Sequence, residues 1–447
     1  MREDVLYRIQ ATNKPFKIFT DYVEDDAMIQ FAECMEQPSV TRGAVMPDAH
    51  AGYVLNIGGV IETKDTIFPS FVGYDIGCGV SECMLDIKAD DVTKEQFQVI
   101  KDEILKAIPI GFERNKGISK KIPLGYAKII NMPMTQFAQE VLQKQGLSQL
   151  GTLGGGNHFL EIGKSEETGN LSIVIHSGSR GVGHKIATHY MKEAAIANTD
   201  EQRYKREFDN NPKSKAWMKS IEAKSPGPRI ATKEMSKELR KYYEVRDEFV
   251  YRRVRARVDN IEGAYPLDIH SQIGKDYIND MNMTLEYALE NRKVMIEKCY
   301  YAICNVIKKI PKELRFINRN HNHAVQRSED SNYWIHRKGA THAEDGMLGV
   351  IPGNMKDGSF IVQGLGNEDS LCSSSHGAGR VLSRRQAKDN LSLDEFINDT
   401  KHLVSNHSDS NIDEAPKAYK DIFEVMDNQK DLVKIIDRII PILNIKG

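Results

Sequence analysis

The sequence of 447 residues predicts an α+β fold, in which one large body of mixed β-sheets carries a helical excursion at about 185–310. Three segments indicate the sheets, because each alternates short apolar runs with glycines, the pattern of short strands joined by tight turns. These segments are 43–86, 151–179 and 316–381. Between the second and the third, glycines become scarce and charged residues frequent, which favours helices. We therefore treat 1–447 as a single domain.

Strand and helix patterns alternate in the first half of the chain. Gly58-Gly59-Val60-Ile61 and Phe71-Val72-Gly73 indicate strands that meet tight turns. Residues 91–105 are charged and carry apolar side chains at helical spacing, so they predict a helix. The run 171–175, Leu-Ser-Ile-Val-Ile, is the most strand-like in the chain. His176 follows it directly, at a strand end, where functional residues concentrate.

The second half contains the excursion and the C-terminal segment. Apolar residues at spacings of three and four predict an amphipathic helix through Ile296, Tyr300, Ile303, Ile307 and Ile310. Residues 205–240 are polar and include Ser225-Pro226-Gly227-Pro228, from which we expect a loop or a mobile arm. Residues 391–447 are predicted to be helical.

Composition restricts the class of protein. Hydrophobic residues make up 40% of the chain and charged residues 28%, and the net charge of −2 gives no overall sign of a nucleic-acid binder. The sequence predicts neither a secretory signal nor a membrane span, because it lacks an apolar run of roughly 18–20 residues. Its six cysteines are widely and irregularly spaced, which favours reduced thiols. We expect a cytoplasmic monomer.

Histidine, cysteine and aspartate stand beside glycines in six short turns. Glycine lets the backbone approach a ligand closely, and these three side chains bind metals or attack phosphorus. One such turn carries little information, whereas six from distant parts of the chain predict a single site assembled by the fold. The turns are 74–79, 154–158, 175–180, 320–323, 336–339 and 375–380.

Five residues in these turns are candidate metal ligands. Asp75 and Cys78 lie three apart in a glycine-rich turn, and a thiolate can bridge two cations. His158, His176 and His321 are the candidate nitrogen ligands, since each has small neighbours. Taken alone, Cys78 is more typical of a buried core residue. Four other histidines are assigned to the surface: His184, His189, His402 and His407.

The segment 373–380 is the candidate for nucleophilic chemistry. It concentrates hydroxyls, one imidazole, two glycines and a guanidinium within eight residues. Because a free imidazole is largely neutral near pH 7, His376 can attack phosphorus without a separate base. Glycine amides and Arg380 would then contact phosphate. The segment is not a Walker A loop. The alternative is a glycine-rich turn with an incidental histidine.

Taken together, these motifs resemble the RtcB family of 3′-phosphate RNA ligases. The likeness runs in family order from about residue 45 to the C-terminus. It rests on segments 47–53, 57–60, 73–80, 151–161, 176–181, 287–288, 291–292, 321–322, 336–341, 376–380 and 446–447. The resemblance implies mixed β-sheets around a dinuclear metal centre, and GTP and two Mn²⁺ ions as cofactors. It further implies joining of RNA ends that bear a 2′,3′-cyclic phosphate or 3′-phosphate to 5′-hydroxyl ends, in RNA repair or tRNA splicing.

The resemblance also implies roles for particular residues. Asp75, Cys78 and His158 would hold one metal, and Cys78, His176 and His321 the other, while His376 would take GMP from GTP as a phosphoramidate. The implied nucleotide contacts are Asn157, His158, Glu161, His321, Asn322, Pro352, Gly353, Asn354, Met355, Ser359, His376, Gly377, Ala378, Gly379 and Lys446. Candidate phosphate or RNA contacts are Arg180, Arg337, Lys338 and Arg380. Manganese rests on the resemblance, because the same ligands suit zinc.

Three places depart from the family pattern. Lys356 and Asp357 stand where small residues are usual, His342 stands where arginine is common, and the turn 54–56 differs. These departures concern substrate and nucleotide preference more than the reaction itself.

A basic run at 251–257, Tyr-Arg-Arg-Val-Arg-Ala-Arg, has two interpretations. It would follow an RNA backbone, or it would be a solvated helix face balanced by Glu244, Asp247 and Glu248. Two other functions also stay open for the whole chain. These are a metal-dependent cyclic phosphoesterase that forms no guanylate adduct, and an RNA-binding protein without catalysis.

Overall fold

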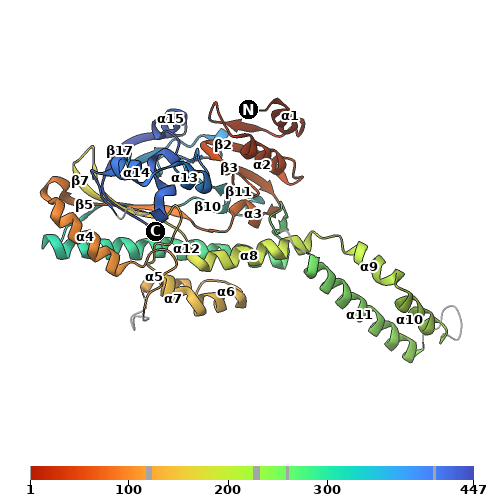
Figure 1. Ribbon diagram of the computed structural model, residues 1–447. Coiled ribbons are helices and arrows are strands. Elements are labelled where there is room, and N and C mark those ends of the chain that lie inside the picture. The colour runs from red at the N-terminus through yellow and green to blue at the C-terminus, as the bar shows by residue number, and fades with distance from the viewer. Residues whose placement is uncertain (1, 117–122, 225–231, 258–260, 406–408) are drawn as a thin grey trace.

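The computed structural model describes residues 2–116, 123–224, 232–257, 261–405 and 409–447. Two β-sheets and the helices around them form the body of the molecule, and a helical arm extends away from it (Figure 1). The mixed α+β class predicted from the sequence is confirmed.

The larger sheet has eight strands and positions most of the candidate site. Seven strands follow the order β13-β14-β17-β6-β7-β5-β9, and β16 pairs with β17. All neighbours on the main path are antiparallel. The bounds are β5 Gly79–Lys88, β6 Phe159–Ser165, β7 Asn170–Ser177, β9 Glu313–Asn320, β13 Leu348–Pro352, β14 Ser359–Gly364, β16 Val404–Ser405 and β17 Val433–Lys446.

The second sheet has five strands in the order β1-β2-β3-β11-β10. Its bounds are β1 Phe16–Ile18, β2 Val40–His50, β3 Ile57–Lys64, β10 Asn322–Gln326 and β11 Tyr333–Lys338. Two small ribbons complete the strands, β12 Ala340–His342 with β15 Ser373–Ser375, and β4 Thr66–Ile67 with β8 Leu267–Asp268. Since β9 belongs to the larger sheet and β10 to the smaller, the chain passes from one sheet to the other at His321.

Helices cover these sheets. The longest, α12, buries Met295, Cys299 and Ile303 in one cluster with Leu160 of β6 and Ile173 of β7. The bounds are α1 Glu3–Ala11, α2 Asp25–Met35, α3 Pro69–Val72, α4 Lys94–Ala107, α5 Leu124–Ile129, α6 Gln136–Val141, α7 Leu147–Gln149, α8 Arg180–Ala197, α9 Glu201–Asn210, α10 Pro212–Glu222, α11 Lys233–Arg257, α12 Gln272–Ile307, α13 Arg384–Asn390, α14 Leu393–Thr400 and α15 Ile422–Asp427. Across the described helices, none combines the length and the apolar content needed to cross a membrane.

The predicted helices at 91–105 and 296–310 are present as α4 and the end of α12. A capping box starts α4, since Thr93 and Gln96 each bond the backbone amide of the other. Ile310 lies beyond the end of α12, because Lys308 adopts a left-handed conformation that terminates the helix.

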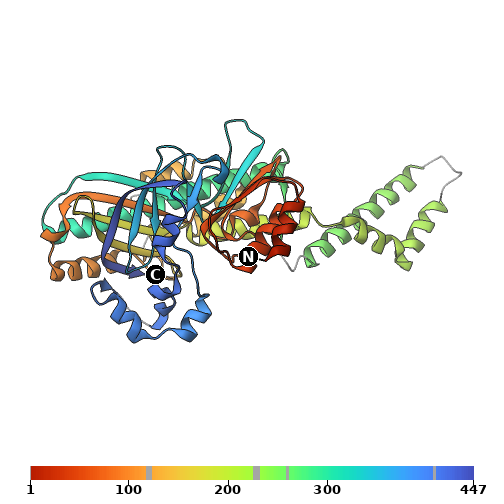
Figure 2. The ribbon, with the colours of Figure 1, turned by 90° about the horizontal axis from the view of Figure 1, so that it is seen from above.

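The helical excursion divides into two parts. Helices α8 and α12 pack on the body, whereas α9, α10 and α11 project from it as an arm (Figures 1 and 2). For 205–240 the sequence predicts a loop or a mobile arm. The loop prediction is wrong for the described residues, which are largely helical and belong to this arm (Figure 1). The arm has few apolar side chains, but they are enough to hold its helices together, because Phe208, Ile221 and Tyr242 form a small core within it. Residues 225–228 lie outside the described residues.

The prediction of helix across 391–447 is wrong for the last fifteen residues. Helices α14 and α15 occur earlier in the segment, but β17 is a strand in the interior of the larger sheet, between β14 and β6. Its isoleucines recur at spacings that also fit a helix. From Asp437 to Leu443, however, buried and partly buried residues alternate, which is the period of a strand. A bulge next to Pro441 accommodates the missing amide proton.

Candidate active site

The candidate metal ligands gather at one end of the larger sheet. Because β6, β7, β5 and β9 are consecutive antiparallel neighbours, the starts of β6 and β5 lie beside the ends of β7 and β9. His158 immediately precedes β6, Cys78 precedes β5, His176 is near the end of β7, and His321 follows β9. Strand order thus brings together residues up to 243 positions apart in sequence.

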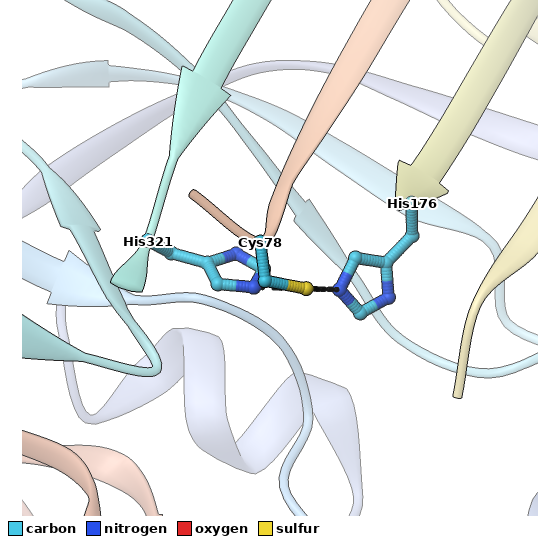
Figure 3. A group of neighbouring side chains, drawn as sticks. All are labelled: Cys78, His176 and His321. Atoms are coloured by element: carbon cyan, nitrogen blue, oxygen red, sulfur yellow. Dashed lines mark hydrogen bonds between the residues drawn. The ribbon is translucent and has the colours of Figure 1, made fainter. Parts of the chain in front are cut away.

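Two overlapping groups of ligand atoms result. One comprises Cys78, His176 and His321, and the other Asp75, Cys78 and His158, with the atoms of each group within 4.8 Å of one another. Cys78 Sγ lies 3.3 Å from His176 Nε2 and 3.4 Å from His158 Nε2. Figure 3 shows the thiol directed towards His176, with His321 on its other side. Cys78 is therefore the shared member of both groups.

The donor set fits metal ions in its chemistry and orientation. The carbonyl oxygen of Leu153 lies 3.0 Å from His158 Nδ1, and that of Asn157 lies 3.1 Å from His176 Nδ1. Because a carbonyl oxygen can only accept a hydrogen bond, Nδ1 of each ring carries the proton. The lone pair of each Nε2 then faces the other candidate ligands. His176 Nε2 and His321 Nε2 lie only 3.3 Å apart. Burial lowers the pKa of both imidazoles well below the usual value. Two neutral imidazole nitrogens whose lone pairs face each other are suited to binding a metal cation between them.

Asp75 is held for the same role by the start of α8. The backbone amide of Ser179 donates to Asp75 Oδ1 at 3.2 Å. Only glycine fits at position 178, since a Cβ atom there would lie 2.2 Å from that carboxylate oxygen. Burial would raise the pKa of Asp75, but His158, Arg180 and Cys78 together outweigh it and lower the pKa to about 2. The group is therefore a carboxylate at neutral pH.

His376 follows β15 and faces a buried carboxylate of the smaller sheet. Asp48 Oδ2 lies 2.6 Å from His376 Nδ1 and accepts from the backbone amides of His376 and Gly377 at 3.1 and 3.2 Å. Burial opposes ionisation of Asp48, but His376, His50 and Lys420 together outweigh it and hold the pKa below its ordinary value. With Nδ1–H directed at this carboxylate, Nε2 carries the free lone pair. The His321 and His376 rings lie 4.7 Å apart between centroids, so this nitrogen adjoins the metal ligands.

A cavity of about 920 Å³ joins these groups. Its walls include Asp75, Cys78, His176, His321 and His376. Of the residues expected to contact nucleotide, all but His158 line it: Asn157, Glu161, His321, Asn322, Pro352, Gly353, Asn354, Met355, Ser359, His376, Gly377, Ala378, Gly379 and Lys446. The structure thus brings together the two sets of residues that the sequence suggested separately, one for metals and one for nucleotide.

Glu161 is a buried carboxyl group in this cavity. It accepts from Asn444 Nδ2 at 2.9 Å and from Ser359 Oγ at 3.4 Å. Burial raises its pKa to about 7, against the opposing influence of Asn444, Lys446 and Ser359. The group therefore changes charge near neutral pH.

The four cationic candidates separate into two pairs. Lys338 and Arg380 line the cavity, whereas Arg180 and Arg337 do not. Arg180 donates to the carbonyl of Gly111 at 3.3 Å and lies 3.4 Å from His158 Nδ1, behind the metal ligands. Arg337 is 1% exposed and donates to Ser373 Oγ and to the Leu371 and Cys372 carbonyls. Its donors are occupied by the protein, so the structure favours a structural role over the expected phosphate contact.

The histidines assigned to the surface differ among themselves. His184 and His402 are exposed, as expected, and His184 stacks on Tyr74. His189 is only partly exposed and stacks on Phe137. His407 lies outside the described residues.

The residues that depart from the family pattern lie away from the ligands. His342 stacks on His323 and pairs with Glu344 at 2.9 Å, outside the cavity lining. Lys356 is exposed and Asp357 accepts from Asn354 at 2.7 Å.

Several cavity residues were not predicted from the sequence. Asp48 positions His376, while Phe159, Arg384, Tyr419 and Asn444 line the cavity. Asp48 had one available signal, since it is a carboxylate within an apolar strand, beside His50. A charge in such a place requires a partner.

Two overlapping groups of possible metal ligands, which share Cys78 and adjoin a histidine held by a buried carboxylate, define a candidate metal-dependent active site. Comparison with known proteins identifies the family. The family described as "tRNA-splicing ligase RtcB" matches residues 30–447, and this chain belongs to the RtcB family.

Individual relatives match this chain over most or all of their length. The chain is similar to the RNA-splicing ligase RtcB of Escherichia coli K12, with 33% identity over 99% of this chain and 100% of the relative. The tRNA-splicing ligase RtcB of Nanoarchaeum equitans is 27% identical over 99% of this chain and 96% of its own. An RNA-splicing ligase RtcB homolog of Entamoeba dispar is 26% identical, covering 98% and 86% respectively. The resemblance inferred from the motifs is confirmed.

Proposed function

We propose that this protein is a GTP- and Mn²⁺-dependent RNA ligase that joins 2′,3′-cyclic phosphate or 3′-phosphate ends to 5′-hydroxyl ends. Membership of the RtcB family supports ligation of RNA. The single observation that carries the mechanism is the 2.6 Å contact of His376 Nδ1 with Asp48, which leaves Nε2 free beside the metal ligands.

His376 serves as the nucleophile in the first step. Its Nε2 attacks the α-phosphorus of GTP, so a P–N bond forms and pyrophosphate leaves with the electron pair of the broken P–O bond. Asp48 stabilises the positive charge that develops on the imidazole, because its carboxylate accepts Nδ1–H. Gly379 permits this close packing, since a Cβ there would lie 2.2 Å from the Asp48 carbonyl oxygen.

RNA then replaces the histidine. An oxygen of the RNA 3′-phosphate attacks the phosphorus of the adduct and releases neutral His376. The 5′-hydroxyl of the second RNA end attacks the activated 3′-phosphate, and GMP leaves. Lys338 lines the cavity and is positioned to balance phosphate charge in these steps. Arg380 also lines it, but its guanidinium already pairs with Glu414.

Metal ions would occupy the two groups that share Cys78. When bound, they would orient the triphosphate and offset the charge that develops on its α-phosphate. The residues that would hold them are Asp75, Cys78 and His158 on one side, and Cys78, His176 and His321 on the other.

Glu161 gives a physical basis for selecting guanine. Guanine presents two N–H donors along one edge, and an ionised carboxylate accepts both, whereas adenine places an acceptor in the middle of that edge. The buried carboxyl beside Ser359 and Asn444 meets this requirement. If ATP bound instead, the acceptor nitrogen of adenine would face the Glu161 carboxylate, and neither acceptor would have a hydrogen-bond donor. A site that leaves buried polar groups unpaired rejects the wrong ligand more strongly than one that only loses an apolar contact.

Incubation with GTP labelled at the α-phosphate tests the proposal. Wild-type protein with Mn²⁺ should acquire acid-labile, alkali-stable label, and His376→Ala should acquire none. A 3′-phosphate RNA and a 5′-hydroxyl RNA should then be joined by the labelled protein. Absence of label with both GTP and ATP, in protein shown to contain metal, would overturn the adduct mechanism. Opening of cyclic phosphates by such a protein would instead favour a phosphoesterase.

A further inference from the structure

The helical arm differs from the rest of the molecule in charge. Residues 201–257 contain 17 lysines and arginines against 9 aspartates and glutamates, a net charge of +8. Because the whole chain carries −2, the remainder carries −10. The small net charge of the whole chain is therefore the sum of a basic arm and an acidic body. Such a separation of charge makes the arm locally attractive to polyanions.

Among the described residues of the arm, most of the exposed cations without an ion pair lie towards its tip. Near its base, cations are paired with carboxylates: Arg246 with Asp209, Arg252 with Glu248 and Arg253 with Glu207. These pairs favour the solvated-face interpretation for the described part of the basic run 251–257. The side chains of Arg255 and Arg257 are not among those described.

The tip carries exposed cations without such partners. Within the described part of the chain, no ion pair involves the exposed side chains Lys213, Lys215, Lys219, Lys233, Lys237, Arg240 and Lys241. They lie on α10 and on the first half of α11, which run side by side (Figures 1 and 2). Exposed ammonium and guanidinium groups of this density match a phosphate backbone.

The arm is a stable element with its base beside the cavity. Tyr204, Val250 and Val254 form one small core and Phe208, Ile221 and Tyr242 another. At the base, Tyr74 lines the cavity, stacks on His184 of α8 and donates to Glu262 Oε1 at 2.7 Å. Helix α8 leads into the arm and Glu262 follows it. A polymer whose end enters the cavity therefore has the arm beside its path.

We propose that the tip of the arm, α10 with the first half of α11, binds the sugar–phosphate backbone of a folded RNA at a distance from the ends being joined. This inference rests on the proposed RNA ligase function. A helix of 25 residues such as α11 is about 37 Å long, so the tip reaches RNA far from the reacting phosphate. Long structured RNA would contact both cavity and tip, whereas an oligonucleotide of a few residues would contact the cavity alone.

A charge-neutralised variant tests this assignment. It replaces five exposed tip cations by glutamine: Lys213, Lys215, Lys219, Arg240 and Lys241. The matched control replaces by glutamine five exposed lysines of the body that make no ion pair with any residue the structure describes: Lys17, Lys94, Lys309, Lys312 and Lys434. Binding of a tRNA-length stem–loop RNA and of a six-nucleotide RNA is measured by filter retention from 50 to 200 mM salt, alongside joining of both kinds of RNA end.

The tip variant should bind the long RNA at least about tenfold more weakly and with a shallower dependence on salt, because fewer counterions are released. Its joining of short RNA and its guanylate adduct should equal those of the wild type, and the control should match the wild type throughout. Unchanged long-RNA binding would overturn the proposal and leave an acidic protein as the candidate partner. A different outcome would separate the two proposals. If the wild-type protein joins no RNA, but the tip variant binds long RNA more weakly than the wild type, the ligase proposal fails while the proposed RNA-binding surface stands.

Discussion

Asp48 Oδ2 lies 2.6 Å from His376 Nδ1, and the same oxygen accepts the backbone amides of His376 and Gly377. Asp48 belongs to β2 and His376 follows β15, so this contact fixes the imidazole relative to the smaller sheet. One oxygen therefore fixes the position and the tautomer of the proposed nucleophile.

Asp48→Asn should slow guanylate adduct formation by about 10²–10⁴-fold, because the amide neither fixes the tautomer nor stabilises the imidazolium. Single-turnover labelling with α-labelled GTP measures this rate. Metal content and the thermal midpoint should remain close to those of the wild type. An unchanged rate would remove Asp48 from the mechanism, and loss of metal together with the rate would indicate a merely structural effect.

Cys78→Ala should abolish binding of both metal ions and adduct formation, since Sγ is common to the two ligand groups. Elemental analysis after dialysis against Mn²⁺ measures the number of metal ions bound per protein chain. Cys372→Ala is the matched control, because that partly exposed thiol is free and lies outside the cavity lining. Full occupancy of both sites in Cys78→Ala would refute the bridging role.

Lowering the pH below about 7 should weaken GTP binding progressively, approaching about tenfold per unit. The pKa of Glu161 is raised to about 7 by burial, so acidification protonates the carboxylate that would accept the guanine N–H groups. The apparent KM for GTP in the labelling reaction, measured from pH 5.5 to 8.5, reports this change. Glu161→Gln should remove that component of the pH dependence and reduce the preference for GTP over ATP. An identical profile in the variant would exclude Glu161 from base recognition.

Arg337→Met and Lys338→Met should have opposite effects on stability. Removing the Arg337 guanidinium removes its hydrogen bonds to the carbonyl oxygens of Leu371 and Cys372, which keep Ser373 Oγ and the Ala343 amide as their other donors. Loss of these charge-assisted bonds should lower the free energy of unfolding by about 1.5–3 kcal/mol. Lys338 Nζ is buried without a hydrogen-bond partner among the described residues, and burial lowers its pKa to about 8.

Since the folded state disfavours the Lys338 cation, Lys338→Met should leave the free energy of unfolding unchanged or higher below pH 8 while reducing joining of RNA. Denaturant titration at pH 7 measures the free energy of unfolding of the Arg337→Met and Lys338→Met variants. Equal destabilisation by both substitutions would contradict the separate roles assigned to these neighbours.

The candidate metal ligands were accessible to sequence reasoning because cysteine and histidine are infrequent in this chain and most of these residues lie in glycine-containing turns. Cys78 and His176 could be named without knowing that β5 and β7 are adjacent strands. Arg337 could not be separated from Lys338, because nothing local tells which of two consecutive cations points into the protein. Strand β17 was missed because its isoleucines fit a helical period, and only its place between β14 and β6 establishes the strand. Asp48 was missed because its role depends on a partner 328 residues away.

The cavity lies where two sheets meet, and its contents come from both. Cys78 precedes β5 and His176 lies near the end of β7 in the larger sheet, whereas Lys338 belongs to β11 of the smaller sheet and Gly377 follows the short ribbon β12–β15. A nucleotide that touches all of them fastens the two sheets together, and at 100 times its Kd it adds about 2.7 kcal/mol to the stability of the folded chain. In a cell depleted of that nucleotide, a larger fraction of the chain would unfold and reach proteases. The abundance of the protein would then follow the supply of its own substrate.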